Sequence, residues 1–324
     1  ETAQHEFLRG VLDQNRFMAM YRKQIENVSA KGTAACYVRL DAADFLTDGR
    51  IRGGAIRLNY VNAENFIPLT VVNDEVMEAA FAGSRLEKGK TRTTLVDFVL
   101  DGSGRYVSET NIFDEHGNRI PELTTVVQLG DVKPFAVLRN AEVNNIDHMT
   151  GYGYPKLYGA IGALQALDLC FNVLYGDLDK ADKLVLVNEL LCKFDGSGNP
   201  ITPNEQIKKI FVMLGHEKLP NQNNFVEEYN PAIRVDELTK AFELCLSLLS
   251  TMFGYGTKKY SFEDGQIKTA TEYAGERQDC MQELNKQRAE AESYIQDICR
   301  AVLWFADTFQ GASWDTEAEI TVDF

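Results

Sequence analysis

The chain has 324 residues, of which 44% are hydrophobic and 25% are charged, and its net charge is −15. These proportions are those of an ordinary globular protein, and the length is sufficient for two or more structural units. The acidic balance argues against a protein that grips nucleic acid with clustered Lys and Arg. It does not exclude a protein that surrounds DNA and lets it slide.

The N-terminal region does not have the pattern of a signal peptide, because His5, Arg9 and Asp13 interrupt its apolar residues. We expect no membrane span, since the best apolar run, Leu244 to Phe253, is much shorter than the roughly 18 residues required. The six cysteines have no CxxC spacing, so buried free thiols in a reducing cytoplasm are predicted. They are Cys36, Cys170, Cys192, Cys245, Cys280 and Cys299.

The first half of the chain predicts a helix followed by a sheet. Apolar residues recur at helical spacing over residues 4–30, and β-type patterns then extend from Ala35 to about Leu138. Consecutive strands without interleaved helices predict a mixed or antiparallel sheet and an α+β fold. The strand candidates are 36–40, 55–61, 94–100 and 105–113, with turns at Asp48-Gly49, 101–104 and 116–118.

The second half predicts two helices, at about 156–178 and 234–253, that flank a small α/β insert. Within the insert we expect strands over 183–191 and 225–229 and a short helix over 205–213. The simplest geometry is two helices packed side by side as a stalk, with the insert at its far end. Glycines stop the second helix at residue 254, and a helix of about 40 residues then begins near Ile267, spanning roughly 60 Å. Its first half is mostly polar and its second half, from Tyr294, is amphipathic.

The ends of the sequence indicate a fragment of a longer protein. There is no initiator methionine, and Glu317 to Phe324 alternates like a strand that is cut off. We therefore expect a return strand at this end of the chain.

No pattern that carries catalysis or metal binding is convincing. Gly89-Lys90-Thr91 lacks the earlier glycine of a phosphate-binding loop and precedes a strand pattern, so a surface turn is favoured. Gly151-Tyr-Gly153 lacks the third glycine of a dinucleotide fingerprint. Asp114-Glu115-His116 is better explained as a polar hairpin turn than as metal ligands. We therefore predict no enzyme activity, no cofactor and no metal.

One loop has an unusual charge. Residues 254–268 carry three lysines against Glu263 and Asp264, so the loop is locally positive in an acidic chain. A solvated loop remains one interpretation, and a loop that touches phosphates transiently is the other. The residues concerned are Tyr255, Lys258, Lys259, Tyr260 and Lys268.

Local motifs, together with the order of the elements, resemble the portal proteins of tailed bacteriophages. The resemblance extends over essentially the whole chain and is greatest for portal (minor capsid) proteins of phages of Gram-positive bacteria. Its most specific part is Gly265-Gln-Ile-Lys-Thr-Ala-Thr-Glu-Tyr273. Asn144-Asn145 with Gly151-Tyr-Gly-Tyr-Pro155 before a helix carrying Leu167-Asp168, and Asn65-Phe-Ile-Pro68, add to it. Ala274-Gly-Glu-Arg277 departs from the Glu-Asn-Ser-like continuation usual in the family.

The resemblance implies a division of the chain into wing, stem, clip and tunnel loop, without the N-terminal segment and the C-terminal crown. The wing would comprise 1–153 and 269–324, the stem helices 154–178 and 234–253, the clip 179–233 and the tunnel loop 254–268. The five residues of the positive loop would then face DNA. In the clip, the resemblance implies contacts to the packaging motor or connector from Lys208, Lys209, Lys218 and Phe225.

The resemblance also implies partners and location. A portal protein forms a ring, usually a dodecamer, at one capsid vertex of the virion, after assembly in the host cytoplasm. Its partners would be other copies of itself, double-stranded DNA bound without sequence specificity, the terminase large subunit, the head–tail connector, the scaffold and the major capsid protein. An acidic lumen that repels DNA would offer little friction, an idea that fails if neutralising lumenal carboxylates leaves packaging unchanged. A purely structural capsid or adaptor protein of a phage or prophage, without a channel role, is the alternative.

Overall fold

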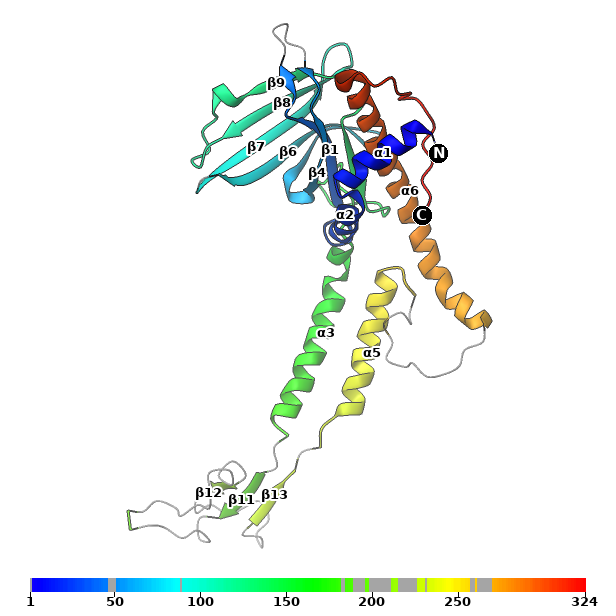
Figure 1. Ribbon diagram of the computed structural model, residues 1–324. Helices are drawn as coiled ribbons and strands as arrows, with labels where there is room; N and C mark the ends of the chain where they lie inside the picture. The colour runs from blue at the N-terminus through cyan, green and yellow to red at the C-terminus, as the bar shows by residue number, and fades with distance from the viewer. Residues whose placement is uncertain are drawn as a thin grey trace. The chain divides into compact units, whose positions relative to one another are not determined.

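The computed structural model describes residues 2–45, 51–87, 89–181, 184–188, 196–197, 211–214, 226–230, 232–256, 260 and 270–324 (Figure 1). The chain divides into two compact units. The larger unit comprises Glu1–Ala160, Met252–Tyr255 and Lys268–Phe324, and the smaller unit comprises Ile161–Thr251 and Gly256–Ile267. Helices and mainly antiparallel sheets occur in the same chain, so the predicted α+β class is confirmed.

The larger unit begins with two helices rather than the single helix predicted for residues 4–30. Helix α1 (Ala3–Gln14) and helix α2 (Phe17–Lys31) are separated where Arg16 adopts a left-handed backbone conformation, with φ of 54°. The side chain of Asn15, at the same break, donates to the carbonyl of Ile56 and accepts from the amide of Leu58. Helix α1 ends here because the side chain of Asn15 forms hydrogen bonds with backbone groups of a nearby edge strand, at Ile56 and Leu58.

A three-stranded antiparallel sheet follows, with β1 (Thr33–Asp41) between β10 (Phe135–Arg139) and β4 (Ala55–Asn62). Short strands β2 (Asp44–Phe45) and β3 (Ile51–Arg52) pair beside it. The strands predicted at 36–40 and 55–61 are therefore confirmed. The predicted turn at Asp48-Gly49 lies outside the described residues.

The second sheet is an antiparallel meander in sequence order, from β5 to β9. Two of its strands, β7 and β8, were predicted; β5, β6 and β9 were not. Alanines and glutamates dilute the β pattern of β6, although it is the longest strand described. The strands are β5 (Phe66–Val72), β6 (Glu75–Glu87), β7 (Lys90–Leu100), β8 (Tyr106–Phe113) and β9 (Thr125–Gln128), with 3-10 turns at Ala63–Asn65 and Pro121–Leu123.

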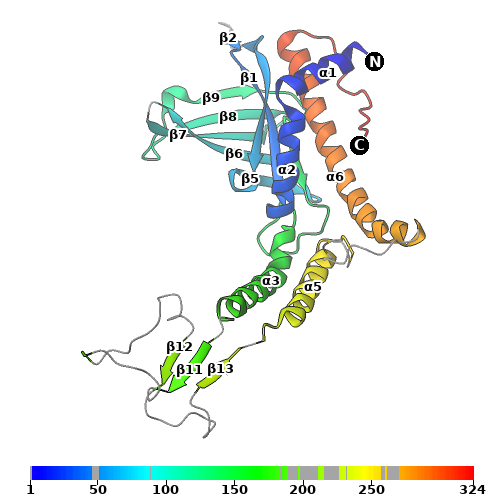
Figure 2. The ribbon, with the colours of Figure 1, turned by 60° about the horizontal axis from the view of Figure 1, so that its bottom comes forward.

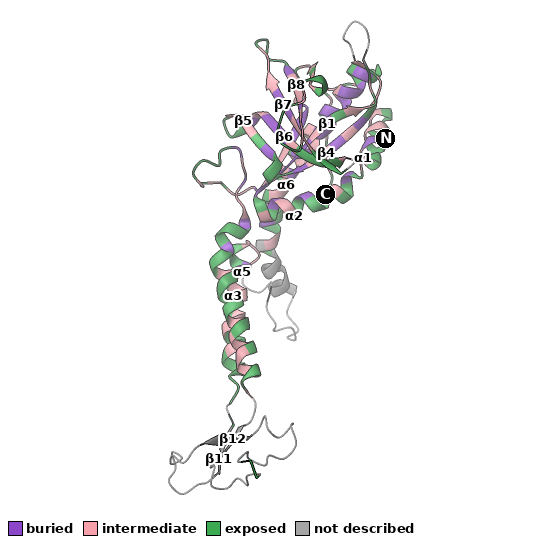
Figure 3. Cartoon of the chain, turned by 90° about the vertical axis from the view of Figure 1, so that its left-hand side faces the viewer, coloured by how far each residue is buried: buried purple, intermediate pink, exposed green. Residues whose placement is uncertain are grey.

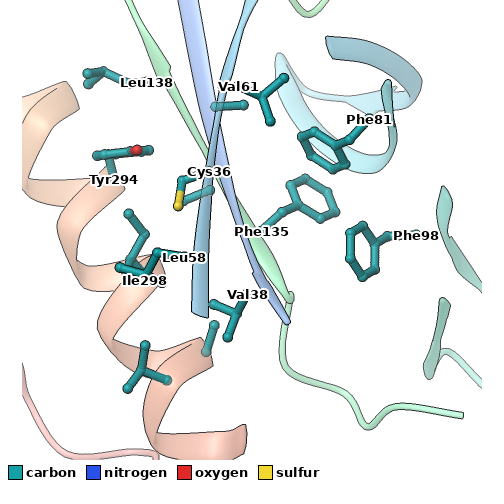
Figure 4. Packing of buried hydrophobic residues seen from close by; sticks show 14 of the residues in the cluster. Cys36, Val38, Leu58, Val61, Phe81, Phe98, Phe135, Leu138, Tyr294 and Ile298 are labelled. Carbon is teal, nitrogen blue, oxygen red and sulfur yellow. The ribbon is translucent and has the colours of Figure 1, made fainter. Parts of the chain in front are cut away.

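The core of the larger unit has three layers. Helix α6 (Ala270–Gln310), 41 residues long, packs its amphipathic end on one face of the three-stranded sheet (Figures 1 and 4). Tyr294 and Ile298 of α6 are each 1% exposed on this side. On the other face, Phe135 contacts Phe81 and Phe98 of the meander, with ring centroids 5.6 and 5.9 Å apart (Figure 4). This burial of large apolar side chains holds the layers together.

The smaller unit contains most of α3 (Lys156–Asp179) and α5 (Val235–Met252), with a three-stranded sheet formed by the chain between them (Figure 2). Strand β11 (Leu184–Asn188) pairs in parallel with β12 (Phe211–Leu214) and antiparallel with β13 (Val226–Tyr229). The predicted strands at 183–191 and 225–229 correspond to β11 and β13. The predicted helix over 205–213 is wrong in its last three residues, which belong to β12.

The strand predicted at 317–324 is absent. The alternating residue types that suggested it do appear in the structure, as alternating exposed and half-buried side chains. The first two residues of the segment, 317 and 318, lie in a turn and a bend, and the segment is held on α6 by side chains instead of a strand ladder. Gln296 donates to the carbonyl of Ile320 at 2.9 Å, and the guanidinium of Arg288 lies 5.6 Å from the ring centre of Phe324. The alternation therefore marks a helix-facing side and a solvent-facing side.

Candidate functional site

Helices α3 and α5 lie side by side (Figures 1 and 2). On α3 the half-buried positions recur at intervals of three and four residues, as in a two-helix seam. They are Ala163, Leu167, Cys170, Val173, Leu174, Gly176 and Asp177. On α5 the half-buried or buried positions are more numerous, namely Leu238, Ala241, Phe242, Glu243, Cys245, Leu246, Ser247, Leu249 and Ser250. The side-by-side arrangement predicted for the two helices is thus present.

Polar contacts fix the register of this pair. Arg234 donates from Nε and from one terminal nitrogen to the two carboxylate oxygens of Asp177, at 3.0 and 2.9 Å. The hydrogen bond from this guanidinium lowers the pKa of Asp177 below its usual value. Further along the pair, burial and the neighbouring thiol of Cys170 raise the pKa of Cys245. An ion pair at one end and paired thiols in the middle define which residues face each other.

Most of the apolar surface of α3 is not covered by α5 (Figure 3). Only Lys156 and Ala160 of this helix are buried, and no charged residue stands between Lys156 and Asp168. Large hydrophobic side chains are exposed on α3 at Leu157, Tyr158, Ile161, Leu164, Leu169, Phe171, Tyr175 and Leu178. A contiguous apolar surface of this kind is typical of an interface with another molecule.

By length and composition alone, α3 also meets the requirement for a membrane-crossing helix, with only 6% of its most apolar window buried. In the sequence alone, Leu244 to Phe253 was the best candidate for a membrane span, and α3 was not considered, because Asp168 interrupts its apolar run. A single helix of this kind is weak evidence for a bilayer, and a protein partner satisfies the same surface.

The turn after α5 is built by glycine. Gly254 and Gly256 have φ values of +76° and +74°, which end the helix in the way the sequence predicted. Tyr255 between them is half-buried, and its ring centre lies 6.3 Å from that of Phe253. Tyr260, the other aromatic residue of the predicted DNA-facing loop, is 40% exposed.

The remaining predicted site residues lie outside the described residues. This applies to the loop residues Lys258, Lys259 and Lys268 and to the clip residues Lys208, Lys209, Lys218 and Phe225. Their roles stay predictions, and the structure brings together only Tyr255 and its neighbours in the turn.

A cavity of about 740 Å³ lies within the larger unit between its two sheets. Its charged lining residues are Arg39 and Arg85, and each already has a carboxylate partner, Asp41 and Glu87 respectively. The other lining groups are apolar side chains, hydroxyls and amides, such as Phe98, Thr94 and Asn59. The lining holds no histidine, cysteine or carboxylate, and its hydroxyl groups, such as those of Tyr37 and Ser108, have no such base among the lining residues.

The weak sequence motifs prove to be turns. Gly89, with φ of +81°, lies in the hairpin between β6 and β7, and Lys90 forms an ion pair with Glu115 at 3.4 Å. The carboxylate of Asp114 accepts from the amides of His116 and Asn118, as in a polar hairpin turn. Within the described residues, no group of three or more His, Cys, Asp or Glu could hold a metal ion.

A buried ion pair between Lys156 and Glu283 was not anticipated from the sequence. The only local signal was a lysine at the first position of an otherwise apolar helix. The two residues are 127 positions apart, so no spacing rule joins them.

No protein-family model matches this chain, and no curated protein sequence matches it significantly.

Proposed function

We propose that this chain is a subunit of a bacteriophage portal ring, a non-enzymatic conduit through which DNA enters and leaves the capsid. The proposal rests on the local motifs that resemble this family and on one structural observation: α3 leaves most of its apolar surface uncovered after pairing with α5. A ring of identical subunits would cover that surface with neighbouring helix pairs.

Other features are consistent with the same role. The order helix α3, small sheet, helix α5, glycine turn and long helix α6 is that of stem, clip, stem, tunnel loop and wing. In this proposal, ATP hydrolysis during packaging belongs to the terminase, and the loop over 254–268 lines the channel.

The partners follow from the proposal. Other copies of the chain would form the ring, double-stranded DNA would pass through it, and the terminase and the head–tail connector would dock on the segment between α3 and α5. Assembly in the host cytoplasm with scaffold and major capsid protein would precede incorporation into the virion. A purely structural capsid or adaptor protein remains the second candidate, because an uncovered apolar helix also suits an interface without a channel.

The first test is the mass of the purified chain by size exclusion with light scattering, combined with negative-stain images of any large peak. Rings with a central hole, formed without detergent, support the portal proposal and argue against a membrane-crossing role for α3. A monomer, or a closed particle without a hole, counts against the conduit.

A further inference from the structure

One carboxylate in the larger unit contacts two segments that are distant in sequence. Glu283 of α6 is 6% exposed, and its Oε1 pairs with the ammonium of Lys156, the first residue of α3, which is 7% exposed. Gln287, one turn further along α6, also donates to Oε1 at 3.1 Å. The start of α3 is therefore held on α6 by a buried ion pair.

The other oxygen of Glu283 packs against the turn that follows α5. A Cβ added to Gly254 would lie 3.0 Å from Oε2 and 3.3 Å from Cδ and Cγ of Glu283. These distances are tighter than ordinary van der Waals contact, so a side chain at position 254 would press on the Glu283 carboxylate, and the positive φ of Gly254, +76°, also favours glycine there. The turn over Met252–Tyr255 belongs to the same unit as Lys156 and Glu283.

A polar network extends from this point toward the strand that precedes α3. Gln287 donates to Oδ1 of Asn140 at 2.8 Å, and Asn140 in turn donates to the carbonyl of Tyr154 at 2.8 Å. Two more charges lie nearby, with Glu142 at 3.6 Å from Lys156 and Lys286 at 3.8 Å from Glu283. Two ammonium groups thus balance two carboxylates, as burial of charge requires.

We propose that Glu283 is a positioning residue that couples the first turn of α3 to the 252–255 turn, so that neither segment moves on α6 independently of the other. The physical reason is that a buried carboxylate stays in place only while its cation stays in place. Without Lys156, the Glu283 side chain gains a proton or turns toward solvent, and Gly254 loses the group on which it packs. Coupling between the two segments then follows from the geometry of one side chain.

This coupling has a consequence for the proposed conduit, and only this consequence rests on the proposed function. The 252–255 turn leads into the loop predicted to face DNA, and α6 is the long helix of the predicted wing. A movement of α6 in the predicted wing would therefore also move the start of that loop, because Glu283 contacts the 252–255 turn.

The test is limited proteolysis of the folded full chain with chymotrypsin, with fragments identified by mass. The enzyme cleaves after Tyr158 in the first turn of α3 and after Phe253 and Tyr255 in the turn, so one digestion reports local opening at both places. In Lys156→Met, we expect cleavage after Phe253 and Tyr255 to become at least about tenfold faster, although Lys156 is not part of that turn. In Gly254→Ala, we expect cleavage after Tyr158 to accelerate reciprocally.

One control variant tests whether loss of another ion pair in the same unit has the same effect, and a further variant changes Glu283 itself. Lys31→Met removes the exposed Lys31–Glu64 ion pair in the same unit and should leave both cleavage rates unchanged. Glu283→Gln keeps the shape of the side chain and should accelerate cleavage at both places. The inference is overturned if Lys156→Met and Gly254→Ala each change only the rate at their own segment. The result does not depend on ring formation or on DNA, so it stands or falls separately from the proposed function.

Discussion

Arg234 and Asp177 meet through two hydrogen bonds, at 3.0 and 2.9 Å, and join the start of α5 to the end of α3 across 57 positions of sequence. This pair sets the register of a helix seam that is otherwise made of small apolar contacts.

The stabilising effect of this ion pair should depend on pH. The guanidinium lowers the pKa of Asp177 in the folded state, so the unfolded state binds more protons as the pH falls. The contribution is therefore present at neutral pH and is lost as the pH falls below the ordinary aspartate value, about 3.9, toward the folded value. Urea unfolding of the parent and of Arg234→Gln should differ at pH 7, and the difference should shrink as the pH is lowered through and below the ordinary aspartate value. A difference that does not shrink as the pH falls would contradict this explanation.

The uncovered face of α3 should be required for assembly. Leu169 is 63% exposed on α3, whereas Leu86 is 74% exposed at the hairpin between β6 and β7. Leu169→Glu places an unpaired charge in a helix–helix interface, which costs several kcal/mol and should reduce the ring fraction at least about tenfold. The matched variant Leu86→Glu should leave it unchanged. Light scattering measures the ring fraction of both variants. Equal ring fractions would show that this face of α3 is not part of the interface.

The lysines of the predicted tunnel loop should affect DNA and not assembly. In Lys258→Ala/Lys259→Ala, loss of two cations should lower the amount of DNA packaged or retained per particle, by roughly two- to tenfold. Ring mass should be unchanged. The control is Arg22→Ala/Lys23→Ala, which removes two adjacent exposed cations from α2. If the DNA content falls equally in both variants, or in neither, the purely structural alternative is favoured.

The buried hydroxyl of Tyr294 should contribute to the stability of the larger unit. It donates to Oε1 of Gln24, whose amide donates to the carbonyl of Ala35 at 2.8 Å. Tyr294→Phe leaves a buried acceptor without this donor, so the free energy of unfolding should fall by about 1–3 kcal/mol. Tyr294→Phe/Gln24→Leu removes the unsatisfied oxygen and should be less destabilised than the sum of the single variants. Urea denaturation measures all three free energies, and simple additivity would contradict the pairing.

Substitution by alanine should have opposite effects on protein stability at two of the glycines. Gly32 ends α2 with φ of +83°, and an added Cβ would lie 2.1 Å from the carbonyl oxygen of Gly153. Gly32→Ala should therefore destabilise the protein by more than about 1 kcal/mol. Gly10 lies within α1 with nothing within 4 Å of an added Cβ, and Gly10→Ala should be neutral or stabilising by up to about 1 kcal/mol. Thermal unfolding of both variants tests this order.

The sequence by itself was sufficient to predict the α+β class, the two paired helices and the long helix. Apolar residues at intervals of three and four mark α3 and α5, and the left-handed glycines at 254 and 256 mark where α5 must stop. These signals are local, because helix periodicity and glycine conformation depend on neighbours along the chain.

The tertiary structure decided the features that join distant residues. The break between α1 and α2 depends on Asn15 binding β4, the 317–324 segment depends on the surface of α6, and the Lys156–Glu283 pair joins positions 127 residues apart. None of these has a spacing rule in the sequence, since each arises when separate elements pack and must satisfy buried polar groups. The uncovered apolar face of α3 likewise became evident only when the structure showed which of its residues α5 covers.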